Sequence, residues 1–432
     1  MNLKKYPFSI LCDLTIVILQ AKILSEEVNM AKPLERIRIL DLTRVLSGPF
    51  ATMVLSDLGA EVIKVERPDV GDIARGNGPI VNGLSTYFLS LNRGKKSIVL
   101  NLDSEQGKNI FLELTKQVDV VVENFVPGAM ERLGLSYEKI RQYNPRIIYA
   151  ACSGFGQTGP YATKPAFDVI VQAMGGILSI TGQKDGPPIR PGVSLGDIVA
   201  GLFLVVAVLA ALQERQVSGE GQMIDVSMLD CQLAIQENAF VRYFATGELP
   251  HALGTRHPVF TPFQVFQTRD GYIAVAMMGG VRDQWPLFCA AIQRLDIIDD
   301  DRFETGWLRT ENYDILEPIL SEAFRARTTA EWLEEFEAVK IPCGPVNNIE
   351  QVAADPQVAH REMIAEVRHP GAGPFKVVDT PIKLSRTPCK VEKSAPDLAE
   401  HTDEVLAELL GMDAQQIEDL RRAGALQRLA RP

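Results

Sequence analysis

Strand-like and helix-like patterns alternate along this chain from residue 34 to residue 151. Parallel strands need long crossover connections, usually helices, so the alternation predicts an α/β fold with a Rossmann-like, doubly wound parallel sheet. Ligands of such sheets bind beyond the carboxyl ends of the strands, and a site is therefore expected there. The predicted strands are the short apolar runs at residues 37–42, 61–66, 97–102, 118–122 and 146–151.

The pattern changes beyond residue 213. A hairpin-like pair surrounds residues 269–271, and helix-like segments then dominate up to residue 339, including one at 329–339 that begins with a threonine cap. This predicts a second, smaller α+β domain, after which the chain packs back onto the first. We expect an N-terminal extension at 1–30, a large domain at 31–229, a small domain at 230–349 and a C-terminal return at 350–432.

The composition excludes several classes of partner. The net charge is -11, from 44 basic and 55 acidic residues. Phosphate-rich surfaces demand positive excess, so a general nucleic-acid or anionic-membrane binder is not expected. The six cysteines lack the paired spacing of metal ligands, and we expect reduced thiols with neither zinc nor disulfides.

Two apolar segments superficially resemble membrane or export signals. Residues 8–24 follow a basic start, but Asp13 interrupts them and no convincing cleavage site follows. We favour a dispensable extension over an export signal. The apolar run at 198–212 is shorter than the roughly 20 residues that a bilayer span requires, and it predicts a core helix. The expected location is the cytoplasm.

Asp197 joins a glycine-containing turn to that apolar run. Unpaired N–H groups and the dipole at a helix N-terminus favour an ionised carboxylate, which is how a nucleophilic aspartate would be held. Asp is also among the preferred capping residues. Taken alone, Asp197 is therefore either a helix cap or a nucleophile.

The loops after the predicted strands collect Gly, Pro, Asn and Asp, which ordinary turns also use. Basic residues are harder to explain as turn chemistry, because they cluster locally in an acidic chain. They are candidate phosphate ligands at the carboxyl end of the sheet: Lys64, Arg67, Arg75, Arg93, Lys95 and Lys96.

The sequence from Gly154 to Gly159 fits the pattern GxGxxG and follows a predicted strand. A dinucleotide fingerprint must also open a helix, whereas Pro160 and Pro165 interrupt the segment that follows. No second strand ending in an acid follows at the required distance either. An NAD-dependent oxidoreductase is thus a minor alternative.

Several motifs, in their order along the chain, resemble the class III CoA-transferase family, the CaiB/BaiF type that includes formyl-CoA transferase. The resemblance extends from about residue 34 to residue 410. Its strongest matches are residues 62–68 with Gly71-Asp72, 122–125 with Pro127-Gly128, 182–188, 195–197, 219–222 and 341–346.

The resemblance implies a two-domain subunit whose chain forms a ring, with two rings interlocked in a homodimer and CoA bound on the Rossmann-like large domain. The family's nucleophile falls on Asp197. The family's CoA contacts fall on Val45, Leu46, Arg67, Leu100, Asn101, Leu102, Asp103, Asn124, Phe125, Val126, Arg132, Lys164, Pro165, Ala166 and Phe167.

Two departures concern specificity. Formyl-CoA transferases have glutamine where this chain has Leu46, and they carry a run of glycines where it offers only Gly279-Gly280. Formyl or oxalyl specificity is therefore doubtful. A dicarboxylic or medium-sized acceptor acid with a succinyl-CoA or acetyl-CoA donor is the family-level expectation.

The expected activity is transfer of CoA from an acyl-CoA to a carboxylic acid, through an aspartyl mixed anhydride and an aspartyl-CoA thioester on Asp197. It needs neither a metal nor a tightly bound cofactor. A 2-methylacyl-CoA racemase is the alternative on the same fold, but racemases of this type place a histidine where this chain has Phe167. A CoA-binding subunit without catalysis is the remaining alternative, and the intact Asp197 disfavours it.

Overall fold

The computed structural model describes residues 32–278 and 284–427, so the predicted extension at 1–30 and the Gly279-Gly280 pair lie outside the described residues. The chain divides into two compact units. Within the described residues, the first unit, here called the sheet unit, comprises residues 32–153, Ala200–Val226 and residues 363–427. The second unit comprises Gly154–Val199 and Ser227–Glu362. The domain limits given above stay predictions.

A six-stranded sheet forms the centre of the sheet unit, in the order β5-β2-β1-β6-β7-β8. The first five strands pair in parallel, with Leu40 of β1 opposite Ile63 of β2 and Val121 of β6. The predicted α/β fold with a parallel sheet is therefore confirmed. The strands are β1 (Arg38–Asp41), β2 (Glu61–Glu66), β5 (Lys96–Val99), β6 (Val120–Glu123), β7 (Ile148–Ser153) and β8 (Met223–Ser227).

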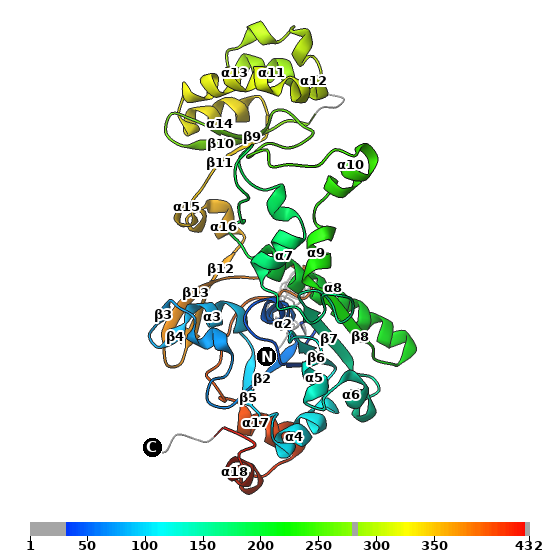
Figure 1. The fold of residues 1–432 in the computed structure, drawn as a ribbon. Coiled ribbons are helices and arrows are strands. Elements are labelled where there is room, and N and C mark those ends of the chain that lie inside the picture. The colour runs from blue at the N-terminus through cyan, green and yellow to red at the C-terminus, as the bar shows by residue number, and fades with distance from the viewer. Residues whose placement is uncertain (1–31, 279–283, 428–432) are drawn as a thin grey trace, which may run out of the picture. The chain divides into compact units, whose positions relative to one another are not determined.

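The C-terminal helices contribute to the core of this sheet unit. Val405 and Leu406 of α17 and Ile417 of α18 are buried in the same apolar cluster as the strands. In Figure 1, α17 and α18 lie beside α4, at the end of the sheet near β5. The helices of this unit are α2 (Ser47–Asp57), α3 (Thr86–Asn92), α4 (Glu105–Thr115), α5 (Ala129–Arg132), α6 (Tyr137–Tyr143), α17 (Thr402–Leu410) and α18 (Ala414–Arg422), with the short helix η2 (Ile73–Gly76). Its minor strands are β3 (Ile80–Val81), β4 (Leu84–Ser85), β12 (Ile364–His369) and β13 (Gly373–Val378).

The second unit contains a three-stranded antiparallel sheet in the order β11-β10-β9. Strands β9 (Phe263–Gln267) and β10 (Tyr272–Ala276) form the predicted hairpin, and β11 (Cys343–Pro345) pairs with β10. Stacked rings such as Phe266 and Phe324, with centroids 4.1 Å apart, fill its core. Its other elements are α7 (Asp168–Met174), η3 (Ile177–Ser179), α9 (Met228–Ala234), α10 (Ala239–Thr246), α11 (Trp285–Ala291), η4 (Leu295–Ile297), η5 (Asp301–Phe303), α12 (Gly306–Glu311), α13 (Tyr313–Arg325), α14 (Thr329–Ala338), α15 (Ile349–Ala353) and α16 (Pro356–His360).

Helix α8 (Leu195–Ser218) is the longest described helix. It is long and apolar enough to cross a membrane, a test that core helices of soluble proteins also pass. The prediction of a core helix is correct only in part, because just 44% of its most apolar window is buried. Leu202, Phe203 and Val206 are exposed on it. An apolar face of this kind is typical of a surface that is covered by another molecule.

The segment that fits GxGxxG does not open a helix. Strand β7 ends at Ser153, and the next helix, α7, begins only at Asp168. A side chain at Gly154 would lie 2.1 Å from the Cβ atom of Ala166, so this glycine is required by close packing. The prediction that this segment is not a dinucleotide-binding fingerprint is therefore confirmed.

Candidate active site

A cavity of about 500 Å³ lies at the carboxyl ends of β1, β2 and β6, within the sheet unit. This is the edge where ligands of parallel sheets bind. It is large enough for a substantial part of a cofactor-sized ligand. It is lined by Leu42, Arg44, Val65, Glu66, Arg67, Pro68, Gly71, Asp72, Leu100, Asn101, Leu102, Asp103, Phe125, Ala129, Arg132 and Leu133.

Three arginines line this cavity: Arg44, Arg67 and Arg132. In the described part of the chain, none of them forms an ion pair with a carboxylate. The Arg44 guanidinium lies 4.4 Å from the centre of the Phe125 ring. Burial and, to a smaller extent, the neighbouring Arg67 lower the pKa of Arg44, and the attraction of Asp72 opposes them only in part. Glu66 and Asp72 also line the cavity but are ion-paired with Arg75 and Lys64, so three guanidinium groups outside such pairs make the cavity suitable for a multiply charged anion.

The other basic residues of the predicted cluster have different roles. Each is held by a carboxylate at an N–O distance of 2.7–3.0 Å, so the structure corrects the prediction that they are phosphate ligands. The pairs are Lys64–Asp72, Arg75–Glu66, Arg93–Asp57, Lys95–Asp41 and Lys96–Glu61. Of the six candidates, Arg67 alone lines the cavity.

The predicted CoA contacts fall into three groups. Arg67, the run Leu100 to Asp103, Phe125 and Arg132 line the cavity. Val45, Leu46, Asn124 and Val126 stand beside it without lining it. Lys164, Pro165, Ala166 and Phe167 belong to the second unit.

Asn124 connects the second group to the cavity. Its side chain accepts the Arg44 backbone N–H and donates to the Arg44 carbonyl, both at 2.8 Å. Arg44 itself was not predicted as a contact. The available signal was its position in the loop directly after the first strand.

Glu123 ends β6 directly before Asn124. Its carboxylate is buried and accepts the Phe125 backbone N–H at 2.7 Å. Burial raises the pKa of Glu123 to about 7, and the nearby Glu131 and Asp225 act in the same direction. The loop that carries Phe125 is thus attached to a carboxyl group that titrates near neutral pH.

Asp197 lies in the first turn of α8, within the second unit. The helix begins at Leu195, so Asp197 is a residue of the first turn and not its cap. The buried carboxylate of Asp168 accepts the Gly196 backbone N–H at 2.8 Å. Arg190 donates to the other oxygen of Asp168 through Nε and Nη2, at 3.0 and 2.8 Å. The turn before Asp197 is therefore held by the Asp168 carboxylate, which binds the backbone of Gly196 with one oxygen and the guanidinium of Arg190 with the other.

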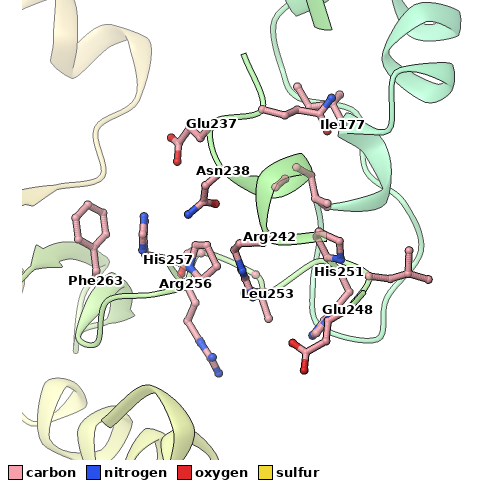
Figure 2. Close-up of a pocket in the computed structure, with 18 of the residues that line it drawn as sticks. Ile177, Glu237, Asn238, Arg242, Glu248, His251, Leu253, Arg256, His257 and Phe263 are labelled. Carbon is pink, nitrogen blue, oxygen red and sulfur yellow. The ribbon is translucent and has the colours of Figure 1, made fainter. Parts of the chain in front are cut away.

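A second cavity, of about 670 Å³, lies within the second unit and was not predicted. Figure 2 shows Asn238, Arg242 and His257 among the side chains around it. The Nδ1 atom of His257 accepts the backbone N–H groups of Val259 and Phe260, which leaves the ring proton on Nε2. The Nδ1 atom of His257 is therefore engaged by its own loop, and Nε2 is the ring atom available to a ligand in the cavity.

Comparison with known proteins defines the class. The family model described as CoA-transferase family III matches residues 34–402, and the chain belongs to this family. The chain is 43% identical to the succinyl-CoA:glutarate CoA-transferase of Mus musculus over 92% of this chain and 91% of that protein. It is 42% identical to the acetyl-CoA:oxalate CoA-transferase of Acetobacter aceti over 82% of this chain and 89% of that protein.

The fold agrees with this assignment. A CAIB/BAIF family protein from Brucella suis superposes with a TM-score of 0.78 at 36% identity, covering 88% of this chain and 100% of that one. The predicted resemblance is confirmed, and the protein is a CoA-transferase. It therefore uses CoA thioesters as substrates.

Proposed function

We propose that Asp197 is the nucleophile that carries the transferred group. The observation that supports this most directly is its place in the first turn of α8, after a turn that Asp168 and Arg190 hold rigidly. The N-terminal end of a helix stabilises a carboxylate and the negative charge that develops on it during acyl transfer.

The reaction proceeds in balanced steps. The Asp197 carboxylate attacks the thioester carbonyl, the C–S bond breaks, and CoA thiolate leaves a mixed anhydride behind. The thiolate attacks the aspartyl carbonyl, which releases the donor acid and forms an aspartyl-CoA thioester. The acceptor carboxylate then attacks this thioester, and the returning thiolate cleaves the second anhydride at the acceptor carbonyl. Free Asp197 and a new acyl-CoA result.

CoA binds, in this proposal, with its phosphates in the cavity of the sheet unit. Arg44, Arg67 and Arg132 supply positive charge there, and Phe125 supplies an aromatic surface. The predicted contacts at Val45, Leu46, Asn124 and Val126 adjoin the same loops. Lys164, Pro165, Ala166 and Phe167, which belong to the second unit, stay proposed CoA contacts on the resemblance to the family.

The proposed substrates are succinyl-CoA as donor and a dicarboxylic acid of the size of glutarate as acceptor. The relative from Mus musculus bears the name of this exchange. Leu46 is apolar where oxalate-using formyl-CoA transferases have glutamine, which disfavours oxalate. A screen of acids with succinyl-CoA tests this, and a kcat/KM for oxalate above that for glutarate would contradict it.

The functional form is proposed to be a homodimer of interlocked rings in the cytoplasm, without a membrane or nucleic-acid partner. Exposed apolar side chains support a protein interface, among them Phe203 and Val206 on α8 and Val241 and Phe244 on α10. Sedimentation at micromolar concentration tests the dimer.

The decisive variant is Asp197→Asn, which is nearly isosteric but a poor nucleophile. It should bind CoA normally and lose at least about 1,000-fold in kcat, or ~4 kcal/mol of barrier. Glu214→Gln, on the exposed end of the same helix, is the matched control and should keep full activity. Activity of the Asp197→Asn variant within tenfold of wild type would contradict the proposal.

A further inference from the structure

Val45 has a backbone conformation that is unusual for its residue type. Its φ angle is +68°, in the left-handed region. Branching at Cβ makes this region costly for valine, and such strain persists only where the surrounding structure enforces it. Val45 stands between Arg44, which lines the cavity of the sheet unit, and Leu46, which precedes α2.

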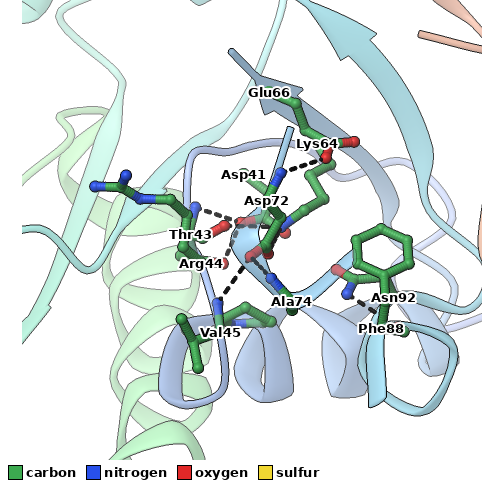
Figure 3. Close-up of polar contacts among 12 residues, drawn as sticks. Asp41, Thr43, Arg44, Val45, Lys64, Glu66, Asp72, Ala74, Phe88 and Asn92 are labelled. Atoms are coloured by element: carbon green, nitrogen blue, oxygen red, sulfur yellow. Dashed lines mark hydrogen bonds and ion pairs between the residues drawn. The ribbon is translucent and has the colours of Figure 1, made fainter. Parts of the chain in front are cut away.

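Asp72 is the group that holds Val45. Its Oδ1 atom accepts the Val45 backbone N–H at 3.2 Å and the Ala74 backbone N–H at 2.9 Å. Its Oδ2 atom lies 2.9 Å from Nζ of Lys64. Figure 3 shows Asp72 between these three partners. The carboxylate thus connects the strained residue to a buried positive charge.

Lys64 also holds Thr43, the residue that precedes Arg44. Its Nζ donates to the carbonyl of Thr43 at 2.7 Å, and its side chain is only 1% exposed. Thr43 is fixed further by Asp41, which accepts its hydroxyl at 2.5 Å and its backbone N–H at 2.8 Å. The Asn124 side chain forms two hydrogen bonds with the backbone of Arg44, so each residue from 43 to 45 is held by a hydrogen bond to a side chain.

We propose that the buried Lys64–Asp72 pair is a positioning device for CoA binding: it holds Val45 in the left-handed conformation, so that Arg44 faces the cavity before the ligand arrives. Asp72 also lines the cavity, but both of its oxygens are engaged by Val45, Ala74 and Lys64, and the pair is proposed to act through the turn, so Lys64 and Asp72 are positioning residues. The inference rests on the proposed binding of CoA phosphates in this cavity. Preorganisation of this kind improves affinity because the ordering cost is met during folding.

The test compares two buried pairs in two backgrounds. The double variant Lys64→Met/Asp72→Ala removes both charges together, since a lone buried charge would be strongly destabilising. Arg93→Met/Asp57→Ala is the control, because that pair is also buried, with side chains 7% and 6% exposed, and neither residue lines the cavity. Each pair is removed with Val45 present and with Val45→Gly, and CoA affinity is measured by calorimetry.

Removal of Lys64 and Asp72 should weaken CoA binding by about 10-fold with Val45 present, since the left-handed conformation must then form during binding. In the Val45→Gly background the same removal should cost less than about threefold, because glycine enters this region without a Cβ penalty. The control pair should change affinity by less than twofold in both backgrounds. Equal losses in the two backgrounds, or no loss with Val45, would overturn the proposal.

Hydrogen exchange on the wild-type chain gives a second test that does not depend on the stability of a variant. The amide of Val45 should be protected without CoA and should not become more protected when CoA is added. Fast exchange that slows on CoA binding would show that the ligand forms the turn, and would overturn the proposal. The variant Arg67→Met tests separately whether CoA binds in this cavity. If this variant and the wild type bind CoA equally, the cavity is not the CoA site. If the variant binds CoA more weakly, the cavity is supported as the site, and the comparison with the Val45→Gly background decides whether Lys64 and Asp72 position the turn.

Discussion

The carboxylate of Asp168 accepts the backbone N–H of Gly196 at 2.8 Å, one residue before the proposed nucleophile. There is little room for adjustment, because a Cβ atom at Gly196 would lie 2.7 Å from a methyl group of Val171. Arg190 fixes the orientation of Asp168 from the other side. The direction in which the first turn of α8 presents Asp197 thus depends on this ion pair.

Arg190→Met should therefore lower kcat by about 10-fold or more, since small misplacements of a reacting group are costly, and should change KM for acyl-CoA less. Steady-state kinetics with succinyl-CoA measures both. Lys184→Met, which removes an exposed ion pair with Asp314 in the same unit, is the control and should have no effect. A change confined to KM would assign Arg190 to substrate binding instead.

Arg44→Met should weaken CoA binding by about 10-fold and make its affinity less dependent on salt, because one charge-assisted contact is lost. Calorimetric titrations at several salt concentrations measure this. Arg141→Met, in the same unit but away from the cavity, should bind CoA like the wild type. An unchanged affinity for Arg44→Met would place the phosphates elsewhere.

Glu123 should make the stability of the protein depend on pH. Its pKa is raised from 4.5 to about 7, so it contributes stability that is complete below pH 4.5 and is lost as the pH rises through 7. Relative to Glu123→Gln, the free energy of unfolding of the wild type should fall by on the order of 3 kcal/mol between pH 5 and pH 8. Denaturant titrations across this range measure the difference. Parallel curves for the two proteins would show that Glu123 titrates normally.

The residue at position 167 distinguishes a CoA-transferase from a racemase, because racemases of this type have a histidine where this chain has Phe167. Its side chain is 74% exposed and offers no group that can exchange a proton. We predict no incorporation of solvent deuterium at the α-carbon of a 2-methylacyl-CoA, measured by mass spectrometry after prolonged incubation. Rapid α-deuteration without exchange of CoA between acids would instead indicate an isomerase.

The sequence was most informative where local patterns decide structure. Alternating apolar runs predicted the parallel strands, and the glycine before an apolar run predicted that Asp197 lies at the N-terminal end of a helix. The prolines after Gly159 also ruled out a dinucleotide site correctly. Each of these signals depends on a few neighbouring residues, and no distant partner changes it.

The sequence was least informative about charge pairing. Lys64, Arg75 and Lys95 looked like free cations in a basic cluster, because their carboxylates are brought to them only by the folded sheet. Conversely, the sequence showed only that Arg44 lies in the loop after the first strand, since its lack of a carboxylate partner is a property of the folded loops. The exposed face of α8 was likewise hidden, because an apolar run looks the same whether this chain or another one covers it.

The most direct test of the aspartyl mechanism follows an acceptor oxygen into the protein. The acceptor acid, labelled with oxygen-18 in its carboxylates, is incubated with the enzyme and succinyl-CoA, and the peptide that contains Asp197 is weighed by mass spectrometry. The proposed steps leave one acceptor oxygen on the Asp197 carboxylate in each turnover, so the peptide should gain oxygen-18 only when succinyl-CoA is present. Efficient formation of the new acyl-CoA with no oxygen-18 in that peptide would contradict the assignment of Asp197 as the nucleophile.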